Sequence, residues 1–306
     1  MGEPAGIGPE VAVAAWHALD GGIGNHPLKL VGDPEVFAAC GDIPAEAVLP
    51  LHARARRNPG KPDAANCEAV VAAISHAVAL ALQGEAAAIV TAPINKHVLM
   101  QSGFGFPGHT DFLAKLTGAG RAVMMLAGEA LRVVPLTVHV PLAEVPRLIS
   151  AETIVETAEI TLKALRRDFA IAQPRLAVAG LNPHAGEDGE LGREEREIIA
   201  PAIAELVKRG HAVAGPLPPD TMFHAEARSR YDAALCMYHD QALIPLKTLS
   251  FWEGVNVTLG LPIVRTSPDH GTAFEIAGKG LADPRSMIAA VRFAAQMTDT
   301  RWRCRS

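Results

Sequence analysis

Three histidines stand at the ends of apolar stretches that we predict to be buried strands. His139 follows LRVVPLTV, His184 follows RLAVAGLNP, and His239 follows DAALCMY. Ligands bind at the carboxyl ends of strands in α/β sheets, and three imidazoles converging there would make a metal site that keeps positions open for a substrate. Each histidine taken alone could equally be an ordinary surface or core side chain, because the separations in sequence are long.

A second group of polar residues follows His239 in the chain. Lys247, Asn256 and Arg265 lie in YHDQALIPLK and in the segment that begins GVNVTLGLPIVRTSPDHG. A lysine and an arginine beside a hydrogen-bonding amide suit a phosphate monoester. Solvated surface charge is the alternative for each of these residues taken singly.

The only GxGxxG pattern spans Gly103 to Gly108. It follows a helix-like run at 95–102 rather than a strand, and no acidic residue closes a strand at the distance that a dinucleotide fingerprint requires. We therefore expect no Rossmann site here. A turn that presents His109 and Thr110 is the simpler interpretation.

The elements that must position these residues follow from alternating apolar and amphipathic runs. Such alternation predicts an α/β fold with a parallel or mixed sheet. GEPAGIGPE (2–10) predicts a strand-to-helix turn with a strand before it, and Gly128-Glu129 predicts a connection between two adjacent strands. The expected strands are 28–32, 86–93, 122–128, 131–140, 175–182, 232–239 and 255–260, and the expected helices are 9–19, 67–83, 151–169, 193–209 and 284–297.

Composition excludes several classes of protein. The chain has 306 residues, 49% of them hydrophobic, and 28 basic against 33 acidic residues give a net charge of −5. A mildly acidic chain without a basic run is a poor partner for nucleic acid or for an anionic membrane. We find no stretch of 18 apolar residues and no signal peptide, and the four scattered cysteines show no metal spacing. We therefore expect a cytoplasmic protein.

Seven motifs give the chain a resemblance to a known family. It resembles the 4-hydroxythreonine-4-phosphate dehydrogenases of vitamin B6 biosynthesis, and the motifs occur in order along nearly the whole chain. The resemblance implies a fold like that of isocitrate and isopropylmalate dehydrogenases, with a mixed sheet and two α/β lobes around a central cleft. Lobe A would take approximately 1–110 and 240–306, and lobe B approximately 111–239. The motifs are GEPAGIGPE (2–10), TAPINK (91–96), GHTDF (108–112), LNPHAGE (181–187), PPDTMF (218–223), YHDQ (238–241) and TSPDHGTAFEIAGKG (266–280).

The same resemblance implies roles for individual residues. It places one divalent metal ion, Zn, Mg, Co or Mn, on His139, His184 and His239, with His239 supplied by the other subunit of a homodimer. It assigns substrate binding to His109, Thr110, Lys247, Asn256 and Arg265. HGTAFEIAGKGLADP further resembles the adenine-binding stretch of the β-decarboxylating dehydrogenases, which implies cofactor contacts from His270, Gly271, Thr272 and Asp283.

The implied reaction is metal-dependent oxidation of 4-phosphooxy-L-threonine by NAD or NADP. The product, 2-amino-3-oxo-4-phosphooxybutanoate, is a β-keto acid that would lose CO2 to give 3-amino-2-oxopropyl phosphate. A divalent cation would lower the pKa of the reacting hydroxyl. Candidates for the proton acceptor are Lys96, Asp220 and Asp240, and Asp240 could instead orient a metal-binding histidine.

Three alternative functions remain open on the sequence. The first is the same chemistry on another four-carbon acid phosphate, such as D-threonate or D-erythronate 4-phosphate, or on an aromatic dihydrodiol, which would need no phosphate-binding residues. The second is a metal-dependent hydrolase, which would need no nicotinamide. The third is a phosphate-binding protein without turnover, which none of the residues favours.

Overall fold

The computed structural model describes residues 1–106 and 108–303, and they form two compact units. Unit 1 contains Met1–Ala122 and Leu261–Asp299, and unit 2 contains Val123–Gly260 with the residues from Thr300 onward. These ranges assign 111–122, 240–260 and the residues from Thr300 onward differently from the lobes expected from the resemblance. The alternation of helices and strands in both units confirms the predicted α/β class.

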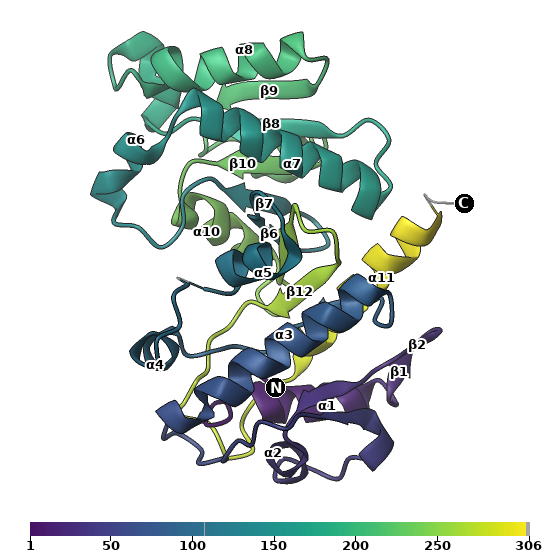
Figure 1. Cartoon of the computed structure of the whole chain (residues 1–306). Coiled ribbons are helices and arrows are strands. Elements are labelled where there is room, and N and C mark those ends of the chain that lie inside the picture. The colour runs from purple at the N-terminus through teal and green to yellow at the C-terminus, as the bar shows by residue number, and fades with distance from the viewer. Residues whose placement is uncertain (107, 304–306) are drawn as a thin grey trace. The chain divides into compact units, whose positions relative to one another are not determined.

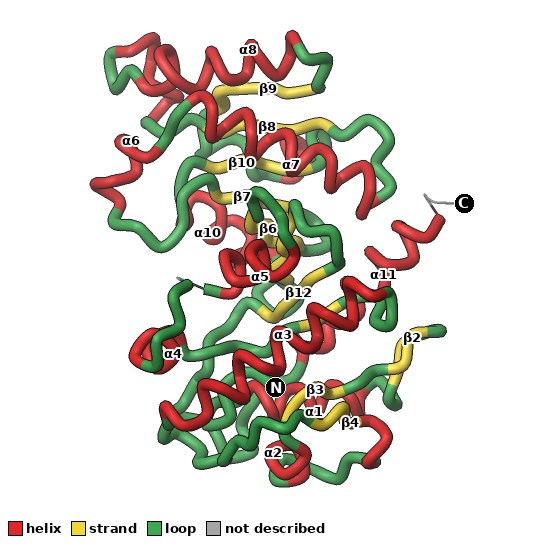
Figure 2. Tube along the Cα trace, viewed as in Figure 1, coloured by secondary structure: helices red, strands yellow, loops and turns green. Residues whose placement is uncertain are grey.

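Unit 2 contains six consecutive strands of a mixed sheet (Figures 1 and 2). Their order is β11-β6-β7-β10-β8-β9; β11, β6 and β7 pair antiparallel, and β7, β10, β8 and β9 pair parallel. The predicted connection at Gly128 is confirmed, because its amide donates to the carbonyl of Leu131 across the turn. The strands are β6 (Val123–Ala127), β7 (Arg132–Pro135), β8 (Arg175–Ala179), β9 (Ala212–Leu217), β10 (Ala233–Cys236) and β11 (Val255–Leu259).

The helices of unit 2 include one that the sequence predicts residue for residue. Helix α7 (Ala151–Phe169) begins at a capping box formed by Ser150 and Thr153, and Ile154, Leu162 and Leu165 on its apolar face are fully buried. The run expected at 193–209 instead starts as a π-helical turn, η5 (Glu195–Ile199), and continues as α8 (Ala200–Lys208). The other helices are η3 (Leu142–Glu144), α6 (Val145–Leu148), η4 (Pro183–Gly189), α9 (Ala225–Arg228) and α10 (His239–Leu249).

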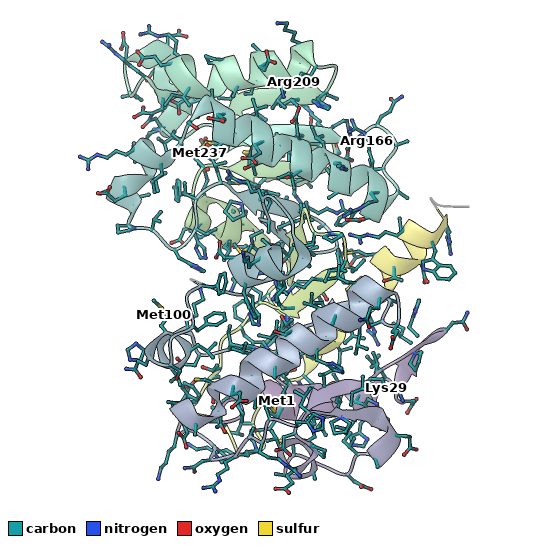
Figure 3. All side chains as sticks on the ribbon, in the orientation of Figure 1. Met1, Lys29, Met100, Arg166, Arg209 and Met237 are labelled. Carbon is teal, nitrogen blue, oxygen red and sulfur yellow. The ribbon has the colours of Figure 1, made fainter. Side chains whose placement is uncertain are left out.

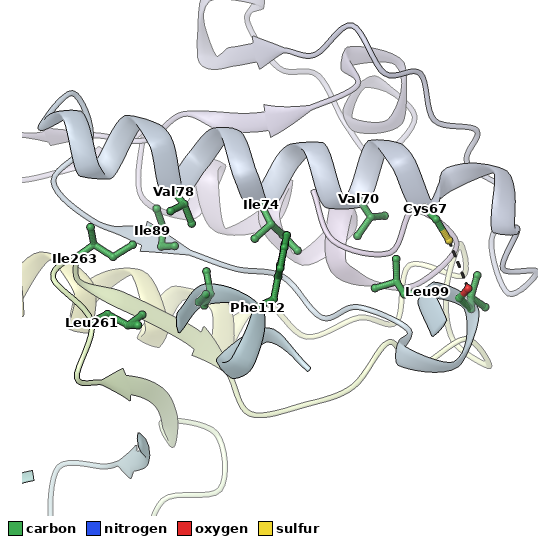
Figure 4. Packing of buried hydrophobic residues seen from close by; sticks show 11 residues of the cluster. Cys67, Val70, Ile74, Val78, Ile89, Leu99, Phe112, Leu261 and Ile263 are labelled. Carbon is green, nitrogen blue, oxygen red and sulfur yellow. Dashed lines mark hydrogen bonds between the residues drawn. The ribbon is translucent and has the colours of Figure 1, made fainter. Parts of the chain in front are cut away.

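Unit 1 has shorter strands than unit 2 (Figure 2). Helix α3 (Cys67–Gln83) packs its apolar face against Leu99, Phe112 and Ile263 (Figure 4). The strands pair as β1 with β2, as β3 with β4 and as β5 with β12. The remaining elements are α1 (Gly8–Ala18), α2 (Pro34–Ala38), α4 (Lys96–Gln101), α5 (His109–Thr117), α11 (Arg285–Arg303), β1 (Gly22–Ile23), β2 (His26–Pro27), β3 (Leu30–Gly32), β4 (Val48–Pro50), β5 (Ile89–Val90), β12 (Arg265–Pro268), η1 (Ala45–Ala47) and η2 (Ala64–Asn66).

The amino-terminal turn of unit 1 is irregular up to Gly8, where α1 begins, and the described residues hold no strand before it. The Met1 ammonium group donates to the carbonyl of Val31 in β3 at 2.9 Å, and burial lowers the pKa of this group to about 5. Met1, labelled in Figure 3, packs against apolar residues of the unit's core. The turn is therefore tied to the interior of unit 1.

Two further properties of the core bear on the sequence analysis. Cys67 and Cys236 are buried and Cys40 is half-buried, and burial raises the pKa of the Cys40 thiol to about 11 and that of Cys236 further still. Cys304 lies outside the described residues. Residues 64–83 are long and apolar enough to cross a membrane by length and composition alone. One side of this helix is nevertheless packed into unit 1, as in the core helix of a soluble protein.

Candidate active site

The three strand-end histidines of the sequence analysis lie at one edge of the unit 2 sheet. Strand β10 pairs parallel with β7 on one side and with β8 on the other, with Cys236 opposite Pro135 and Leu235 opposite Val178. The carboxyl ends of all three strands therefore meet at the same edge. His139 follows β7, His184 follows β8 and His239 follows β10.

Buried hydrogen bonds join the loops that carry these histidines. The hydroxyl of Thr137 donates to the carbonyl of Met237 at 2.8 Å. The amide of Met237, labelled in Figure 3, donates to Oε1 of Gln241 at 2.7 Å, and Nε2 of Gln241 donates to the carbonyl of Gly180 at 2.8 Å. Gln241 thus connects the loops after β10 and β8. It lies in the YHDQ motif, yet sequence reasoning gave it no role.

The structure brings two of the three histidines together. The ring centroids of His139 and His239 are 5.8 Å apart, and Nδ1 of His239 lies 2.6 Å from Oδ1 of Asp240. A carboxylate on one ring nitrogen is the usual device that orients the other nitrogen toward a metal. Among the described residues, no three histidine, cysteine, aspartate or glutamate side chains stand within reach of one ion. Imidazole nitrogens are suitable ligands for a divalent cation. A single chain brings together two of the three proposed ligands, His139 and His239.

The histidine loops have strained backbones. The φ angles of His139 and His184 are 53° and 52°, and residues 185–188 after His184 also lie in the left-handed region. That conformation costs L-residues about 1–2 kcal/mol each. Strain of this kind persists where surrounding contacts enforce it, and it clusters at functional sites. The imidazoles of His139 and His184 are exposed at this edge.

Two substrate candidates belong to unit 2. Lys247 projects from α10, with Nζ 5.8 Å from the ring centroid of Phe251. Asn256 lies on β11 opposite Leu126, and its Oδ1 is buried without a hydrogen-bond partner among the described residues. A buried acceptor without a partner is costly, so a ligand that donates a hydrogen bond would be favoured here.

The other substrate candidates form a buried corner of unit 1. Arg265 on β12 is 3% exposed, and its Nη2 donates to the hydroxyl of Thr91 at 2.6 Å. Burial lowers the pKa of Arg265 to about 10. His109 opens α5, followed by Thr110, and Nε2 of His109 is buried without a hydrogen-bond partner among the described residues. Sequence reasoning missed Thr91, although it lies in the TAPINK motif.

The protonation of His109 follows from this corner. Burial is the main cause that lowers the pKa of His109 well below its ordinary value, and the positive charges of Arg265 and Lys96 add to the effect. Lys96 opens α4, and its Cε would lie 3.2 Å from a Cβ placed on Gly108. His109 is therefore neutral near pH 7 and can both donate and accept a hydrogen bond.

The cofactor candidates lie on a loop of unit 1 that packs against the GEPAGIGPE turn. The amide of Ile7 donates to the carbonyl of Thr272 at 2.9 Å, and a Cβ on Gly6 would lie 2.7 Å from the same oxygen. Only glycine fits that approach. Nε2 of His270 is buried without a hydrogen-bond partner among the described residues, which suits a ligand such as a nucleotide base.

Asp283 is engaged by a neighbour. Arg285 donates to both carboxylate oxygens, at 2.8 and 2.6 Å to Oδ2 and 3.1 Å to Oδ1, and these bonds lower the pKa of Asp283.

Sequence reasoning missed a second ion pair near the cofactor loop, between Arg57 and Glu10. Arg57 donates to the carbonyl oxygens of Pro4 and Gly6 and to Glu10, and Glu10 in turn accepts a bond from the amide of Gly278.

The three candidates for the proton acceptor are not gathered in one place by any described contact. Asp220 is exposed in the turn after β9, Asp240 contacts His239, and Lys96 lies beside Gly108 in unit 1. The contact of Asp240 with His239 is the one that an orienting role requires.

Each unit also encloses a cavity. The cavity in unit 1, of about 540 Å³, is lined mainly by apolar side chains, and Thr91 and His109 are the only candidate-site residues in its wall. The cavity in unit 2, of about 630 Å³, lies between β8, β9 and residues 218–231 and contains none of the candidate residues. The wall of the unit 2 cavity includes Arg175 and Arg230, which form ion pairs with Asp232 and Glu226.

Comparison with known families gives a match over most of the chain. Residues 25–294 match the family model described as pyridoxal phosphate biosynthetic protein PdxA. A 4-hydroxythreonine-4-phosphate dehydrogenase from Roseobacter denitrificans is 54% identical over 97% of this chain and 95% of its own length. The enzyme of the same name from Paracoccus denitrificans is 52% identical over 98% and 97%.

Solved structures agree with this match. The crystal structure of 4-hydroxythreonine-4-phosphate dehydrogenase from Klebsiella pneumoniae aligns with a TM-score of 0.86 at 39% identity, covering 97% of this chain and 98% of the other. A terephthalate 1,2-cis-dihydrodiol dehydrogenase from Burkholderia xenovorans aligns with a TM-score of 0.65 at 29% identity, covering 96% of each chain. The predicted isocitrate and isopropylmalate dehydrogenase-like fold class is thereby confirmed.

Proposed function

Because the chain belongs to the PdxA family of pyridoxal phosphate biosynthetic proteins, we propose that it is a 4-hydroxythreonine-4-phosphate dehydrogenase. In this reaction C3 of 4-phosphooxy-L-threonine loses a hydride to NAD(P)+, and the hydroxyl group on C3 loses a proton to a base. The resulting 2-amino-3-oxo-4-phosphooxybutanoate loses CO2 and takes up a proton to give 3-amino-2-oxopropyl phosphate. The observation that carries the proposal is the identity of 54% with an enzyme of that name over nearly the full length of both chains.

Lys247, Asn256 and Arg265 are proposed to hold the substrate's phosphate. The buried guanidinium of Arg265 is stabilised by the anionic oxygens of a phosphate. The unsatisfied Oδ1 of Asn256 is stabilised by a hydroxyl group of the same substrate that donates a hydrogen bond to it. Lys247 would add a second cation. Fixing the phosphate at one end of a four-carbon substrate fixes the direction from which C3 meets the nicotinamide.

His109 and Thr110 are proposed to bind the same substrate. The neutral state of His109 supports this role, because a neutral imidazole can accept a hydrogen bond from an ammonium or hydroxyl group or donate one to a carboxylate. Its buried Nε2 then gains the partner that the described residues do not supply.

A divalent cation is proposed to bind His139, His184 and His239, and the adjacent imidazoles of His139 and His239 support this proposal. When bound, such an ion supplies Lewis acidity toward the reacting hydroxyl. Three imidazoles favour the softer ions, so Zn or Co is expected ahead of Mg or Mn. Asp240 is proposed to orient His239, which leaves Lys96 and Asp220 as candidates for the base.

His270, Gly271, Thr272 and Asp283 are proposed to contact NAD or NADP, which supplies the hydride acceptor. The buried Nε2 of His270 and the close packing of Gly6 against Thr272 support a base-binding role for this loop. The ionised Asp283 suits a ribose hydroxyl more than the phosphate of NADP, because like charges repel.

We further propose a cytoplasmic homodimer whose active site takes residues from both subunits. The free cysteines among the described residues support a reducing compartment. The shared site is what the family resemblance implies; within one chain the imidazoles of His139 and His239 are adjacent, and no described group of three donors surrounds one ion.

The main alternative is the same chemistry on another substrate, such as D-threonate or D-erythronate 4-phosphate. The dihydrodiol dehydrogenase relative shows that the fold also occurs in an enzyme named for an aromatic dihydrodiol. The presence of Lys247, Asn256 and Arg265 favours a phosphorylated substrate over a dihydrodiol.

A turnover panel tests the proposal. The purified protein is mixed with each candidate phosphate and with a dihydrodiol, with NAD+ or NADP+, with and without divalent metal, and absorbance of the reduced nicotinamide is recorded. We expect the highest kcat/KM with 4-phosphooxy-L-threonine, together with release of CO2. A higher kcat/KM for a threonate or erythronate phosphate would transfer the assignment to that substrate, and a lack of nicotinamide reduction with every candidate would overturn it.

A further inference from the structure

We propose that Glu195 is the positioning residue that fixes the His184 loop, defined as residues 180–189, in the conformation that presents His184. The inference rests on the proposed function only for the role of His184 as a metal ligand. The conformation of the loop is a property of the chain itself and is measured separately.

The His184 loop has a strained backbone. His184, Ala185, Glu187 and Asp188 all have φ between 42° and 55°, and glycine is the residue type that tolerates this region without strain. Its backbone hydrogen bonds are local, in the turn from the amide of Ala185 to the carbonyl of Asn182 and in the 3-10 helical segment η4. Such a backbone persists only where the surroundings enforce it.

The carboxylate of Glu195 supplies the enforcing contacts. Oε1 accepts hydrogen bonds from the amides of Leu181 and Asn182, both at 2.7 Å, and Oε2 accepts one from the side-chain Nδ2 of Asn182 at 3.0 Å. Glu195 is 4% exposed, so these bonds form away from water. One side chain therefore fixes the consecutive amides of Leu181 and Asn182, which precede the left-handed run by one residue, Pro183.

The glycines of the loop show how closely the backbone approaches that carboxylate. A Cβ on Gly186 would lie 2.6 Å from Oε2 of Glu195, and a Cβ on Gly180 would lie 3.1 Å from Oε1. Gly186 also has a φ of 83°. The loop thus wraps around the carboxylate from both ends, and any side chain at position 186 would displace it.

Glu195 is itself held by the core of unit 2. It begins the π-helical turn η5, whose last residue, Ile199, is fully buried, and α8 continues from there with Leu206 fully buried. Single π-helical turns are frequent at functional sites. The carboxylate therefore holds the exposed His184 loop in a fixed position relative to η5 and α8.

Glu195 acts through the loop rather than on the substrate, because its oxygens are buried under the loop backbone. The side chain of His184 is exposed and does not bond to Glu195. The backbone of the loop is held by Glu195 at Leu181 and Asn182, three and two residues before His184. Residues that orient metal ligands in this way typically change metal affinity by about 10–100-fold when replaced.

The test compares Glu195→Gln with Glu197→Gln in the full-length protein. The first keeps the size of the side chain but turns an –NH2 group toward donors. The second makes the same charge change on the same turn, at a side chain that is 55% exposed and faces Arg193 and Arg196. For Glu195→Gln we expect a loss of Co2+ or Zn2+ affinity of about 10–100-fold, with an equal or smaller fall in kcat and an unchanged KM for NAD(P)+. Glu197→Gln should differ from the parent by less than about twofold.

Hydrogen exchange of the backbone amides measures how firmly the His184 loop is held, and it does not depend on activity. In the parent protein the amides of Leu181 and Asn182 should exchange at least about tenfold more slowly than those of His184 and Glu187, although all lie at an exposed edge. Glu195→Gln and Gly186→Ala should both abolish this protection, while protection in α7 is retained.

The outcomes separate this inference from the proposed function. Fast exchange at Leu181 and Asn182 in the parent overturns the inference, and this measurement needs no variant. Unchanged exchange in a folded Glu195→Gln protein overturns it as well. Loss of protection with unchanged metal affinity and kcat leaves the loop contact in place but overturns the positioning role. If His184→Ala also leaves metal affinity unchanged, the proposed metal set is the part that has failed.

Discussion

The corner of unit 1 around His109 and the histidine edge of unit 2 place candidate site residues by opposite means. In unit 1, Arg265 lies in a strand, His109 opens a helix, and both are shielded from water, which lowers the pKa of each. In unit 2, His139 and His184 stand on left-handed backbone and are exposed. Burial tunes the chemistry of the first region, whereas the second depends on loops fixed by hydrogen bonds to Gln241 and Glu195.

The comparison predicts that the unit 2 histidines respond most strongly to substitution, and that the response reveals which chain supplies each one. Each of the alanine variants His139→Ala, His184→Ala and His239→Ala should lose most activity while retaining its fold. Mixed in pairs under conditions that exchange subunits, a pair of variants regains activity only if its two histidines come from different subunits. Random exchange of independent sites restores about one quarter of the parent activity.

The three mixtures distinguish the possible arrangements. If His239 is the partner's contribution, it complements both other variants. If His139 and His239 stay together, as their ring contact in one chain has them, His184→Ala complements both instead. If none of the three mixtures recovers activity although labelled subunits show that exchange has occurred, all three histidines of a site come from one chain.

The next largest effect is expected in the buried corner. Arg265→Ala should raise the KM for the phosphorylated substrate by about 30-fold or more, because a charge-assisted contact away from water is lost. Lys247→Ala should act in the same direction with a smaller effect, because its side chain is only half-buried. The KM for NAD(P)+ should not change. Arg166→Ala, at an exposed arginine of α7 (Figure 3), is the matched control. Parental KM values in both the Arg265 and the Lys247 variants would refute the phosphate assignment.

A smaller effect concerns pH. His109 has a lower pKa when folded than when unfolded, so protons favour the unfolded chain. Above about pH 6.5, His109 does not lower the free energy of unfolding. As the pH drops from there toward the folded pKa of His109, the free energy of unfolding falls. Over that interval the parent should lose about 1.4 kcal/mol per pH unit more than His109→Gln does. Urea titrations of the parent, His109→Gln and the exposed His97→Gln between pH 5 and 7 measure this slope. Equal slopes for the parent and His109→Gln would show that His109 titrates normally.

The smallest effect tests how the corner holds its guanidinium. Thr91→Val removes the hydroxyl that accepts the bond from Arg265 and should raise the substrate KM about three- to tenfold, with little change in kcat. Thr91→Ser keeps the hydroxyl and should restore the parental KM. If the serine and valine variants behave alike, the methyl packing of Thr91 matters rather than its hydrogen bond.

The same contrast explains which parts of the molecule could be predicted. Helix α7 was predicted residue for residue, because its capping serine and its apolar spacing agree. Strands β7, β8 and β10 are also predicted, because buried parallel strands are continuous apolar runs, but each ends three to five residues before its predicted end. Strand β9, by contrast, begins with the exposed Ala212 and contains Gly215 and Pro216, so it carries little strand signal.

The missed site residues share one property: their partners are backbone groups or side chains far away in the chain. Glu195 looked like an acidic residue in the first turn of a helix, where the helix dipole favours a carboxylate. Nothing in its spacing reveals that its oxygens bind amides at 181 and 182. Thr91 and Arg265 are likewise 174 residues apart. Short-range patterns indicate what a residue can do, and only the fold shows what it contacts.

The burial of the cysteines provides a way to time the opening of each unit separately. Cys67 lies in the α3 core of unit 1, and Cys236 lies in the central strand of the unit 2 sheet, where it is fully buried. A buried thiol reacts with an alkylating reagent only when the surrounding structure opens. In a protein with Cys40 and Cys304 replaced by serine, the alkylation rate of Cys67 reports the opening of unit 1, and that of Cys236 reports the opening of unit 2. If substrate or metal lowers the alkylation rate of only one thiol, it stabilises the unit that contains that thiol.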